Sequence, residues 1–178
     1  MGNVGPGMPV SVTINSILAL KEVTPPEFLD ESTGHSSTSR RKDIYETPVP
    51  EVLYRGETYF QNVYGKVSGR VMGQMDRSGT EDLGLVARLM YAYILSDINI
   101  LSAAESSFVL IAALIPQDLN AQLKGHLRGA LNLGATVEEV KAVRKTVIRI
   151  CEAYGMTKHG DAVPAGWGWR EEVADVKG

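Results

Sequence analysis

Hydrophobic residues along most of this chain recur every three or four positions, which is the spacing of one face of an α-helix. Between Pro50 and Asp76, this spacing joins Val52, Leu53, Phe60, Val63, Tyr64, Val67, Val71 and Met72. After a break at residues 76–79, a second stretch places on one side Leu83, Val86, Ala87, Met90, Tyr91, Ile94 and Leu95. The pattern therefore predicts two helices separated by a polar turn.

The next predicted helix has clear signals at both ends. Ser102 and Glu105 are spaced as a capping box, in which the serine oxygen accepts from the N3 amide and the glutamate reaches back to the serine amide. The residues that follow, SSFVLIAAL, are apolar on nearly every side. We expect a central helix that ends at Pro116.

Two more helices complete the predicted domain. Residues 119–133 form a helical stretch that ends at Gly134, a suitable residue for a helix C-terminus. Thr136 and Glu139 form a second capping box, which opens a helix as far as about Tyr154.

The chain ends are less regular than its middle. Residues 10–23 alternate like a strand at first but favour a short helix, and residues 30–50 are polar enough to predict a long loop. We expect an all-α domain of about six helices at 50–155, an N-terminal extension at 1–49 and a C-terminal arm at 156–178.

Composition excludes several partners. The formal net charge is −3, so no basic field is available for nucleic acid or anionic lipid. The longest apolar run, Phe108 to Pro116, is too short to span a bilayer. The one cysteine, Cys151, excludes a disulfide framework, a thiol pair and a cysteine-based metal site. We expect neither nucleic-acid nor membrane partners.

Neither end of the sequence shows a targeting signal of the two types considered. The N-terminus lacks the charged start and apolar run of a signal peptide. The last residues, Asp-Val-Lys-Gly, are not a peroxisomal signal of the Ser-Lys-Leu type. With low cysteine use, these features predict a cytoplasmic protein.

His126 is the main candidate for chemistry. It lies at the edge of the apolar face of the helix at 119–133, beside a stripe of small residues at Ala121, Gly125 and Gly129. A histidine suits general acid–base catalysis, although the same position is typical of a hydrogen-bonded core residue. Gln122, one turn earlier, is placed to orient the ring or to bind a carboxylate or carbonyl.

Other side chains have two interpretations each. Tyr64, Tyr91 and Tyr93 either donate to a substrate oxygen or are half-buried aromatics with their tips at water. Arg55 is either an ion-pair partner or a ligand. We expect no metal site, because no cluster of histidines and carboxylates has ligand spacing. No motif includes His35, His159, Trp167 or Trp169. The two tryptophans lie in the C-terminal arm, and they favour docking of that arm on protein.

The segments LSAAESSFVLIAAL, QLKGHLRGALNLGATVEEV and AYG together resemble the carboxymuconolactone decarboxylase family, within the alkylhydroperoxidase D-like superfamily. The resemblance covers Ser102 to Gly155 and extends more weakly upstream. It implies an all-helical, cofactor-free protein that assembles into homo-trimers or homo-hexamers, with active sites near subunit contacts.

The peroxidase branch of that superfamily is excluded by residue type. Its motif, aligned on His126, would place the two thiols at Leu119 and Gln122 and a glutamate at Ser107. Thiolates are the redox agents in that branch, and leucine and glutamine cannot replace them. We therefore expect no thiol peroxidase activity by that mechanism.

The decarboxylase branch resembles the chain better, with Gln122 where that branch commonly has a glutamate and Ser106 where it often has an arginine. The resemblance implies a decarboxylase or lactone-processing enzyme for a small carboxylated substrate. His126 would move the proton, and Gln122, Tyr91, Tyr64 and Ser107 would bind substrate. The alternative is a non-catalytic structural or binding oligomer of the same fold.

Overall fold

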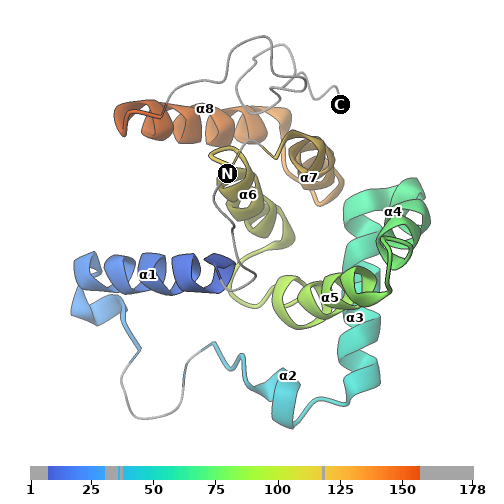
Figure 1. The fold of residues 1–178 in the computed structure, drawn as a ribbon. Coiled ribbons are helices and arrows are strands. Elements are labelled where there is room, and N and C mark those ends of the chain that lie inside the picture. The colour runs from blue at the N-terminus through green and yellow to red at the C-terminus, as the bar shows by residue number, and fades with distance from the viewer. Residues whose placement is uncertain (1–7, 31–35, 37, 118, 157–178) are drawn as a thin grey trace. The chain divides into compact units, whose positions relative to one another are not determined.

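Every regular element in the described residues is helical, which confirms the all-α prediction (Figure 1). The computed structural model describes residues 8–30, 36, 38–117 and 119–156. The chain divides into two compact units, residues 1–41 and 42–178. In the first unit, α1 (Met8–Val23) confirms the short helix expected there, and the 3₁₀ turn η1 (Pro26–Phe28) follows.

The second unit begins with two helices in and after the predicted polar loop. α2 (Lys42–Tyr45) is a single turn inside the region expected to be irregular. α3 (Val49–Tyr64) follows, with Pro50 in its first turn, where a missing backbone N–H costs nothing. The predicted loop is thus interrupted by α2 and ends at Val49.

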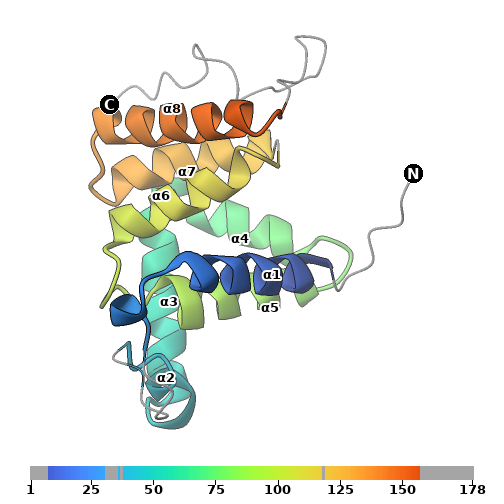
Figure 2. The same cartoon turned by 90° about the vertical axis from the view of Figure 1, so that its left-hand side faces the viewer.

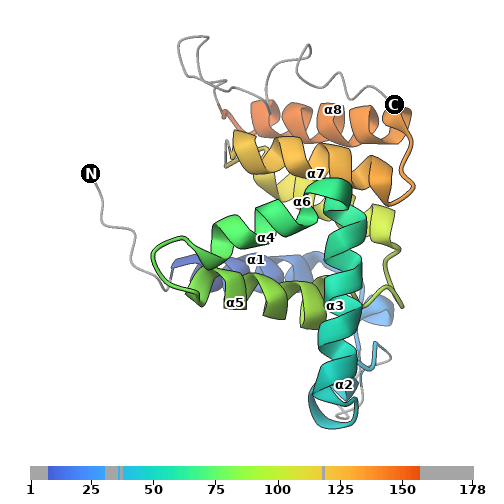
Figure 3. The same cartoon turned by 90° about the vertical axis from the view of Figure 1, so that its right-hand side faces the viewer.

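The first helical stretch is broken where the hydrophobic spacing predicts continuity. α3 ends at Gly65, whose φ of 54° lies in the left-handed region that favours glycine. A 3₁₀ turn, η2 (Gly65–Val67), then leads into α4 (Ser68–Asp76). The break redirects the chain, so that α4 packs beside α5 (Asp82–Leu89) and both contact α3 (Figure 3).

The second stretch continues past α5 as a π-helix, η3 (Met90–Leu95). Its wider turn is visible in the hydrogen bond from the Ser96 amide to the Tyr91 carbonyl, at 3.0 Å. Tyr91 and Ala92 are buried against α3. Several other apolar residues expected on the same side are instead exposed: Leu83, Val86, Met90 and Ile94.

The last three helices stack together (Figure 2). They are α6 (Ala103–Leu114), α7 (Asn120–Asn132) and α8 (Val137–Ala153). Both predicted capping boxes are present, at Ser102 with Glu105 and at Thr136 with Glu139. A core of buried aliphatic residues joins the three helices: Ile111, Ile115, Leu123, Leu127, Ala130, Ala135 and Val140.

A second core lies between α3 and η3 and is largely aromatic. Its buried members are Tyr59, Phe60, Val63 and Tyr91. α7 contacts α3 as well as α6, and therefore joins the two cores. Among the helices that the structure describes, none is long and apolar enough to cross a membrane.

The closest backbone approach between α3 and η3 occurs at Gly56, and it generates a stability prediction. A Cβ atom at Gly56 would lie 2.4 Å from the Ala92 Cα and 2.6 Å from the Ala92 nitrogen. Because both are backbone atoms, we expect Gly56→Ala to lower the free energy of unfolding by about 2 kcal/mol or more. Urea denaturation followed by circular dichroism measures the loss.

Gly69→Ala is the matched control, because nothing lies within 4 Å of the added Cβ in α4. We expect it to be neutral or slightly stabilising, since alanine favours helix over glycine by up to about 1 kcal/mol. Equal effects of the two substitutions would contradict the close packing at Gly56.

Candidate functional site

The candidate site forms where α7 crosses α3. A Cβ at Gly129 would lie 2.8 Å from the Val63 side chain and 3.4 Å from the Val63 carbonyl oxygen, so the two helices approach closely there. The Asn132 side chain also donates to the Val63 carbonyl, at 2.8 Å. This confirms, at Gly129, the close approach expected from the stripe of small residues.

The crossing places the Tyr64 ring against His126. The two ring centroids are 6.2 Å apart, with the rings at 64° in an edge-on arrangement. Gly125 lies one turn before Gly129, and a Cβ there would make an ordinary contact with the Tyr64 ring, at 3.6 Å. Tyr64 therefore lies beside His126, as a substrate-binding residue of the predicted site would.

Burial controls the charge of His126. The ring is mostly buried, and burial lowers the pKa of His126 below its ordinary value because the charged form loses its hydration. Among the described residues, none donates a hydrogen bond to the ring or accepts one from it. The imidazole is thus neutral near pH 7, without the carboxylate partner that would favour protonation.

Tyr91 extends the cluster away from His126. Its hydroxyl donates to the Tyr64 hydroxyl, at 3.2 Å. Burial, and then the neighbouring Tyr64, raise the pKa of Tyr91, so its phenol stays protonated at neutral pH. Phe60 packs between the two tyrosines, with ring centroids 4.5 Å from Tyr64 and 4.7 Å from Tyr91. Tyr91, Tyr64 and His126 form a continuous contact chain from η3 through α3 to α7.

The other two predicted substrate-binding residues are placed differently. Gln122 is exposed, and no hydrogen bond joins it to His126. Ser107 is buried, and its hydroxyl donates to the Ala103 carbonyl one turn earlier in α6, at 3.2 Å. Of the predicted site residues, the structure brings together His126, Tyr64 and Tyr91, whereas Gln122 and Ser107 have no hydrogen bond to that group.

Glu105 caps the N-terminus of α6. It accepts from the Ser102 amide at 2.8 Å, and its hydrogen bonds with Ser102 lower its pKa. Its capping role, expected from the sequence, is confirmed. Cys151 is buried, as expected for a small hydrophobic side chain. His35, His159, Trp167 and Trp169 lie outside the described residues.

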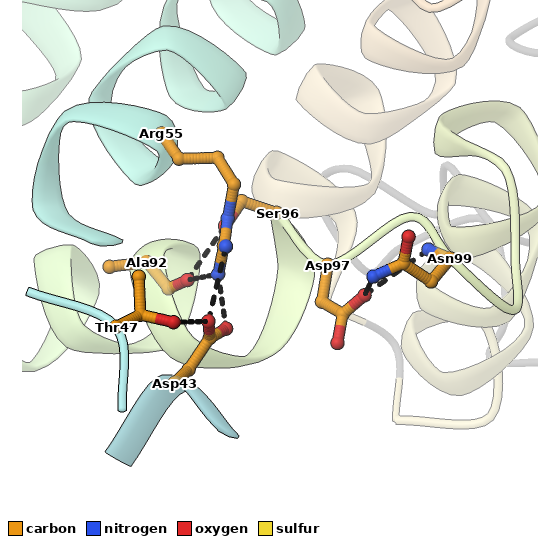
Figure 4. Close-up of polar contacts among 7 residues, drawn as sticks. All are labelled: Asp43, Thr47, Arg55, Ala92, Ser96, Asp97 and Asn99. Atoms are coloured by element: carbon orange, nitrogen blue, oxygen red, sulfur yellow. Dashed lines mark hydrogen bonds and ion pairs between the residues drawn. The ribbon is translucent and has the colours of Figure 1, made fainter. Parts of the chain in front are cut away.

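Arg55 is the centre of a polar network that fixes η3 (Figure 4). Its guanidinium donates to the Ser96 hydroxyl at 2.9 Å and to the Ala92 carbonyl at 3.2 Å. It also forms a hydrogen-bonded ion pair with Asp43 of α2. The hydrogen bond from Arg55 lowers the pKa of Asp43. The arrangement has the character of a structural ion pair, which holds α2 and the π-helical turn against α3.

A cavity of about 600 Å³ opens between α3, α4, α5 and η3. Apolar and aromatic residues form much of its lining: Pro50, Leu53, Tyr54, Phe60, Met72 and Tyr91. His126 is not among the lining residues, whereas Tyr91 belongs both to the lining and to the His126 cluster. The described residues contain no group of three or more histidine, cysteine, aspartate or glutamate side chains that could hold a metal ion.

Sequence reasoning missed Phe60 and Tyr59 as members of the aromatic cluster around Tyr64 and Tyr91. Tyr59 packs at 6.2 Å from Tyr91, and its hydroxyl donates to the Ala103 carbonyl at 3.5 Å. The available signal was the recurrence of aromatic residues at 59, 60 and 64 of one helix. It was not decisive, because aromatic residues at helical spacing are most often ordinary core residues.

Two curated proteins are similar to this chain. It is 38% identical over 149 residues to "Peroxisomal protein 2" of Schizosaccharomyces pombe, covering 84% of this chain and 65% of the relative. It is 34% identical over 169 residues to "Peroxisomal protein 2" of Saccharomyces cerevisiae, covering 86% of this chain and 59% of the relative. The chain thus spans less than two thirds of the length of either relative. Models of known protein families give no match, and neither do solved structures.

The expected cytoplasmic location is wrong in view of these relatives, since both are named as peroxisomal proteins. The expectation rested on missing address signals, and a missing signal does not select a compartment.

The lowered pKa of His126 predicts a pH dependence of stability. As the pH falls below about 6.5, the unfolded chain takes up a proton at His126 before the folded chain does. We therefore expect the free energy of unfolding to decrease from about pH 6.5 down to the lower folded pKa. Urea denaturation across this range measures the effect, and His126→Gln should remove that share of the pH dependence.

Nuclear magnetic resonance titration gives an independent test of the same pKa. The His126 ring resonance, assigned by its loss in the glutamine variant, should have a midpoint below about 6.5. A midpoint at or above that value would contradict the neutral, buried imidazole.

Proposed function

We propose that this chain is a cofactor-independent proton-transfer enzyme of the carboxymuconolactone decarboxylase type, acting on a small carboxylated or lactone substrate. The observation that carries the proposal is the neutral imidazole of His126 beside the hydrogen-bonded Tyr64–Tyr91 pair. A neutral imidazole is the form that accepts a proton, and the hydroxyl of Tyr64, which accepts from Tyr91, can donate a hydrogen bond of its own.

The residues have separate roles in the proposed chemistry. In a decarboxylation, the bond to the carboxylate carbon breaks, CO₂ leaves, and the electron pair passes to an adjacent carbonyl as an enolate. Tyr64 donates a hydrogen bond to the enolate oxygen, and Tyr91 supports Tyr64 through their shared hydrogen bond. The enolate carbon then takes up a proton, which His126 carries from solvent.

For a lactone, the same residues would shift a double bond without net proton consumption. His126 takes a proton from the carbon next to the carbonyl and returns it at a conjugated carbon. The enolate formed in between has the same oxygen, and Tyr64 stabilises it in the same way. One arrangement of donors therefore serves both substrate classes.

We further propose that the protein works in the peroxisome. The proposal is supported by the two yeast relatives, which align with 84% and 86% of this chain and are named as peroxisomal proteins. It does not depend on the catalytic proposal.

A second candidate is a non-catalytic homo-oligomer, and one observation favours it. α5 and η3 expose a broad apolar surface, which is typical of a protein contact. Its members, each at least 42% exposed, are Leu83, Leu85, Val86, Leu89, Met90 and Ile94. A trimer or hexamer would bury such a surface, with or without chemistry at His126.

The catalytic proposal predicts that His126→Gln lowers kcat/KM at least about 100-fold, because general acid–base groups contribute 10²- to 10⁴-fold. Tyr64→Phe should cost about tenfold or more while the aromatic packing is kept. A screen of β-keto acids and unsaturated lactones, followed by CO₂ release or absorbance, provides the assay.

Gln122→Ala is the matched control on the same helix, and its exposed side chain predicts a smaller loss than either variant. Activity that survives in His126→Gln would remove His126 from the mechanism. If no substrate is turned over, and Leu89→Glu converts an oligomer into monomers, the second candidate is favoured.

The peroxisomal proposal predicts that the full chain, fused to a fluorescent protein and expressed in yeast, gathers in spots that coincide with a peroxisomal marker. Fusions at either end control for masking of a terminal signal. Diffuse fluorescence from both fusions in cells with normal peroxisomes would overturn the proposal.

A further inference from the structure

The Arg55 guanidinium joins three partners that belong to different parts of the chain (Figure 4). Its Nε atom donates to the Ser96 hydroxyl at 2.9 Å, and one Nη atom donates to the Ala92 carbonyl at 3.2 Å. Both Nη atoms donate to the Asp43 carboxylate. Because a guanidinium is flat and its donors are fixed relative to one another, it holds these three partners in one relative arrangement.

Asp43 fixes the guanidinium from α2. Its carboxylate accepts from both Nη atoms and also from the Thr47 hydroxyl, at 3.2 Å. The aspartate side chain is only 12% exposed, and that of Arg55 is 38% exposed. Partial shielding from water makes such a pair stronger than one at the open surface. Arg55 is therefore restrained at its own position before it binds the turn.

The two groups that Arg55 binds on η3 enclose the backbone next to Tyr91. The Ser96 amide donates to the Tyr91 carbonyl at 3.0 Å, and the Ser96 hydroxyl donates to the Ala92 carbonyl at 2.6 Å. Arg55 binds that same hydroxyl and that same carbonyl. One side chain of α3 therefore ties down the turn from which the Tyr91 ring extends.

α3 also carries the group to which Tyr91 donates. The Tyr91 hydroxyl donates to the Tyr64 hydroxyl, near the end of α3, at 3.2 Å. Hydrogen bonds between hydroxyls are usually about 2.7 to 2.8 Å long, and a contact of about 3.6 Å no longer counts as one. A displacement of η3 by roughly half an ångström would therefore break this bond.

We propose that Arg55 is a positioning residue, which sets the place of the Tyr91 hydroxyl against Tyr64 by way of the π-helical turn. Its effect on turnover rests on the proposed function, whereas the positioning itself does not. The competing explanation is that packing alone fixes the turn, through the close approach at Gly56 and the contact of Phe60 with Tyr91.

The test follows the tyrosine Cζ resonances of the full chain labelled with carbon-13, because this carbon bears the hydroxyl. Tyr91→Phe identifies the Tyr91 resonance, and Tyr64→Phe gives its position without the hydrogen bond. We expect Arg55→Met to move the Tyr91 resonance at least halfway from its parent position to that reference. An unmoved resonance in Arg55→Met would mean that packing alone holds the turn, and it overturns the proposal.

Arg88→Met is the matched control. The Arg88 side chain is 46% exposed and forms two hydrogen bonds with an aspartate, Asp76. Those bonds join α5 to α4 and include no residue of η3, although Arg88 is closer to Tyr91 in the sequence than Arg55 is. We expect the Tyr91 resonance to stay at its parent position. Equal shifts in the two methionine variants would indicate general loosening and contradict a specific role of Arg55.

Arg55→Lys separates charge from geometry. Lysine keeps the positive charge but has a single ammonium group, which cannot hold three partners in the arrangement of the guanidinium. We expect the Tyr91 resonance to move in the same direction as in Arg55→Met, and a parent-like spectrum would count against the proposal. Melting temperatures show that each variant is folded. If Arg55→Met does not fold, Arg55→Lys provides the comparison with the control.

Kinetics on any β-keto acid or lactone that the chain turns over give a second readout. Arg55→Met should lower kcat about as far as Tyr91→Phe does, by at least about threefold, with KM changed less than about twofold. In the Tyr91→Phe background, Arg55→Met should lower kcat no further, because a residue that acts through a hydroxyl has no effect once the hydroxyl is absent. Losses that multiply in the double variant would overturn the proposal.

The positioning and the proposed function fail separately. If no substrate is turned over, the proposed function fails, and the Tyr91 resonance still decides the role of Arg55. If His126→Gln abolishes turnover while Arg55→Met leaves both kcat and the Tyr91 resonance unchanged, the positioning role fails and the proposed function stands.

Discussion

The contact between α3 and η3 at Gly56 is the constraint on which the rest of the second unit depends. At this point, the backbone of α3 lies so close to Ala92 that no side chain fits between them. The approach brings Phe60 within 4.7 Å of Tyr91, ring centroid to centroid, and brings the Arg55 guanidinium to the Ala92 carbonyl. A wider separation would loosen the aromatic core and the polar network together.

The π-helical turn and the Arg55 network support each other. In a π-helix, the backbone bonds reach one residue further than in an α-helix, and such turns are costly without outside support. Here the Ala92 carbonyl accepts from Arg55 and also from the Ser96 hydroxyl, at 2.6 Å. Asp43 completes the network from α2. Tyr91 lies in this supported turn, so its position depends on an ion pair that does not touch the aromatic cluster.

The parts of the fold that were predictable from sequence depend on local chemistry. The capping boxes at Ser102 and Thr136 need only residues three apart, and Gly134, with φ of 97°, ends a helix by its own conformational freedom. The break at Gly65 was missed because the hydrophobic spacing continues across it. Tyr59 and Phe60 were missed as members of the aromatic cluster for a related reason, since the cluster joins residues of α3, η3 and α7 that only tertiary packing brings together.

The site also departs from the usual way in which a histidine is activated. A carboxylate partner would raise the pKa of the imidazole and make its protonated form a ready acid. At His126, burial acts in the opposite direction, and no described residue supplies that hydrogen bond. The resting histidine is therefore suited to accepting a proton, and the ring beside it is that of Tyr64, whose hydroxyl accepts from Tyr91. Because burial keeps Tyr91 protonated, its hydrogen bond to Tyr64 remains while the histidine is neutral. A site built in this way suits reactions that begin with proton removal next to a carbonyl, in which a negative oxygen develops and must be stabilised without a cation.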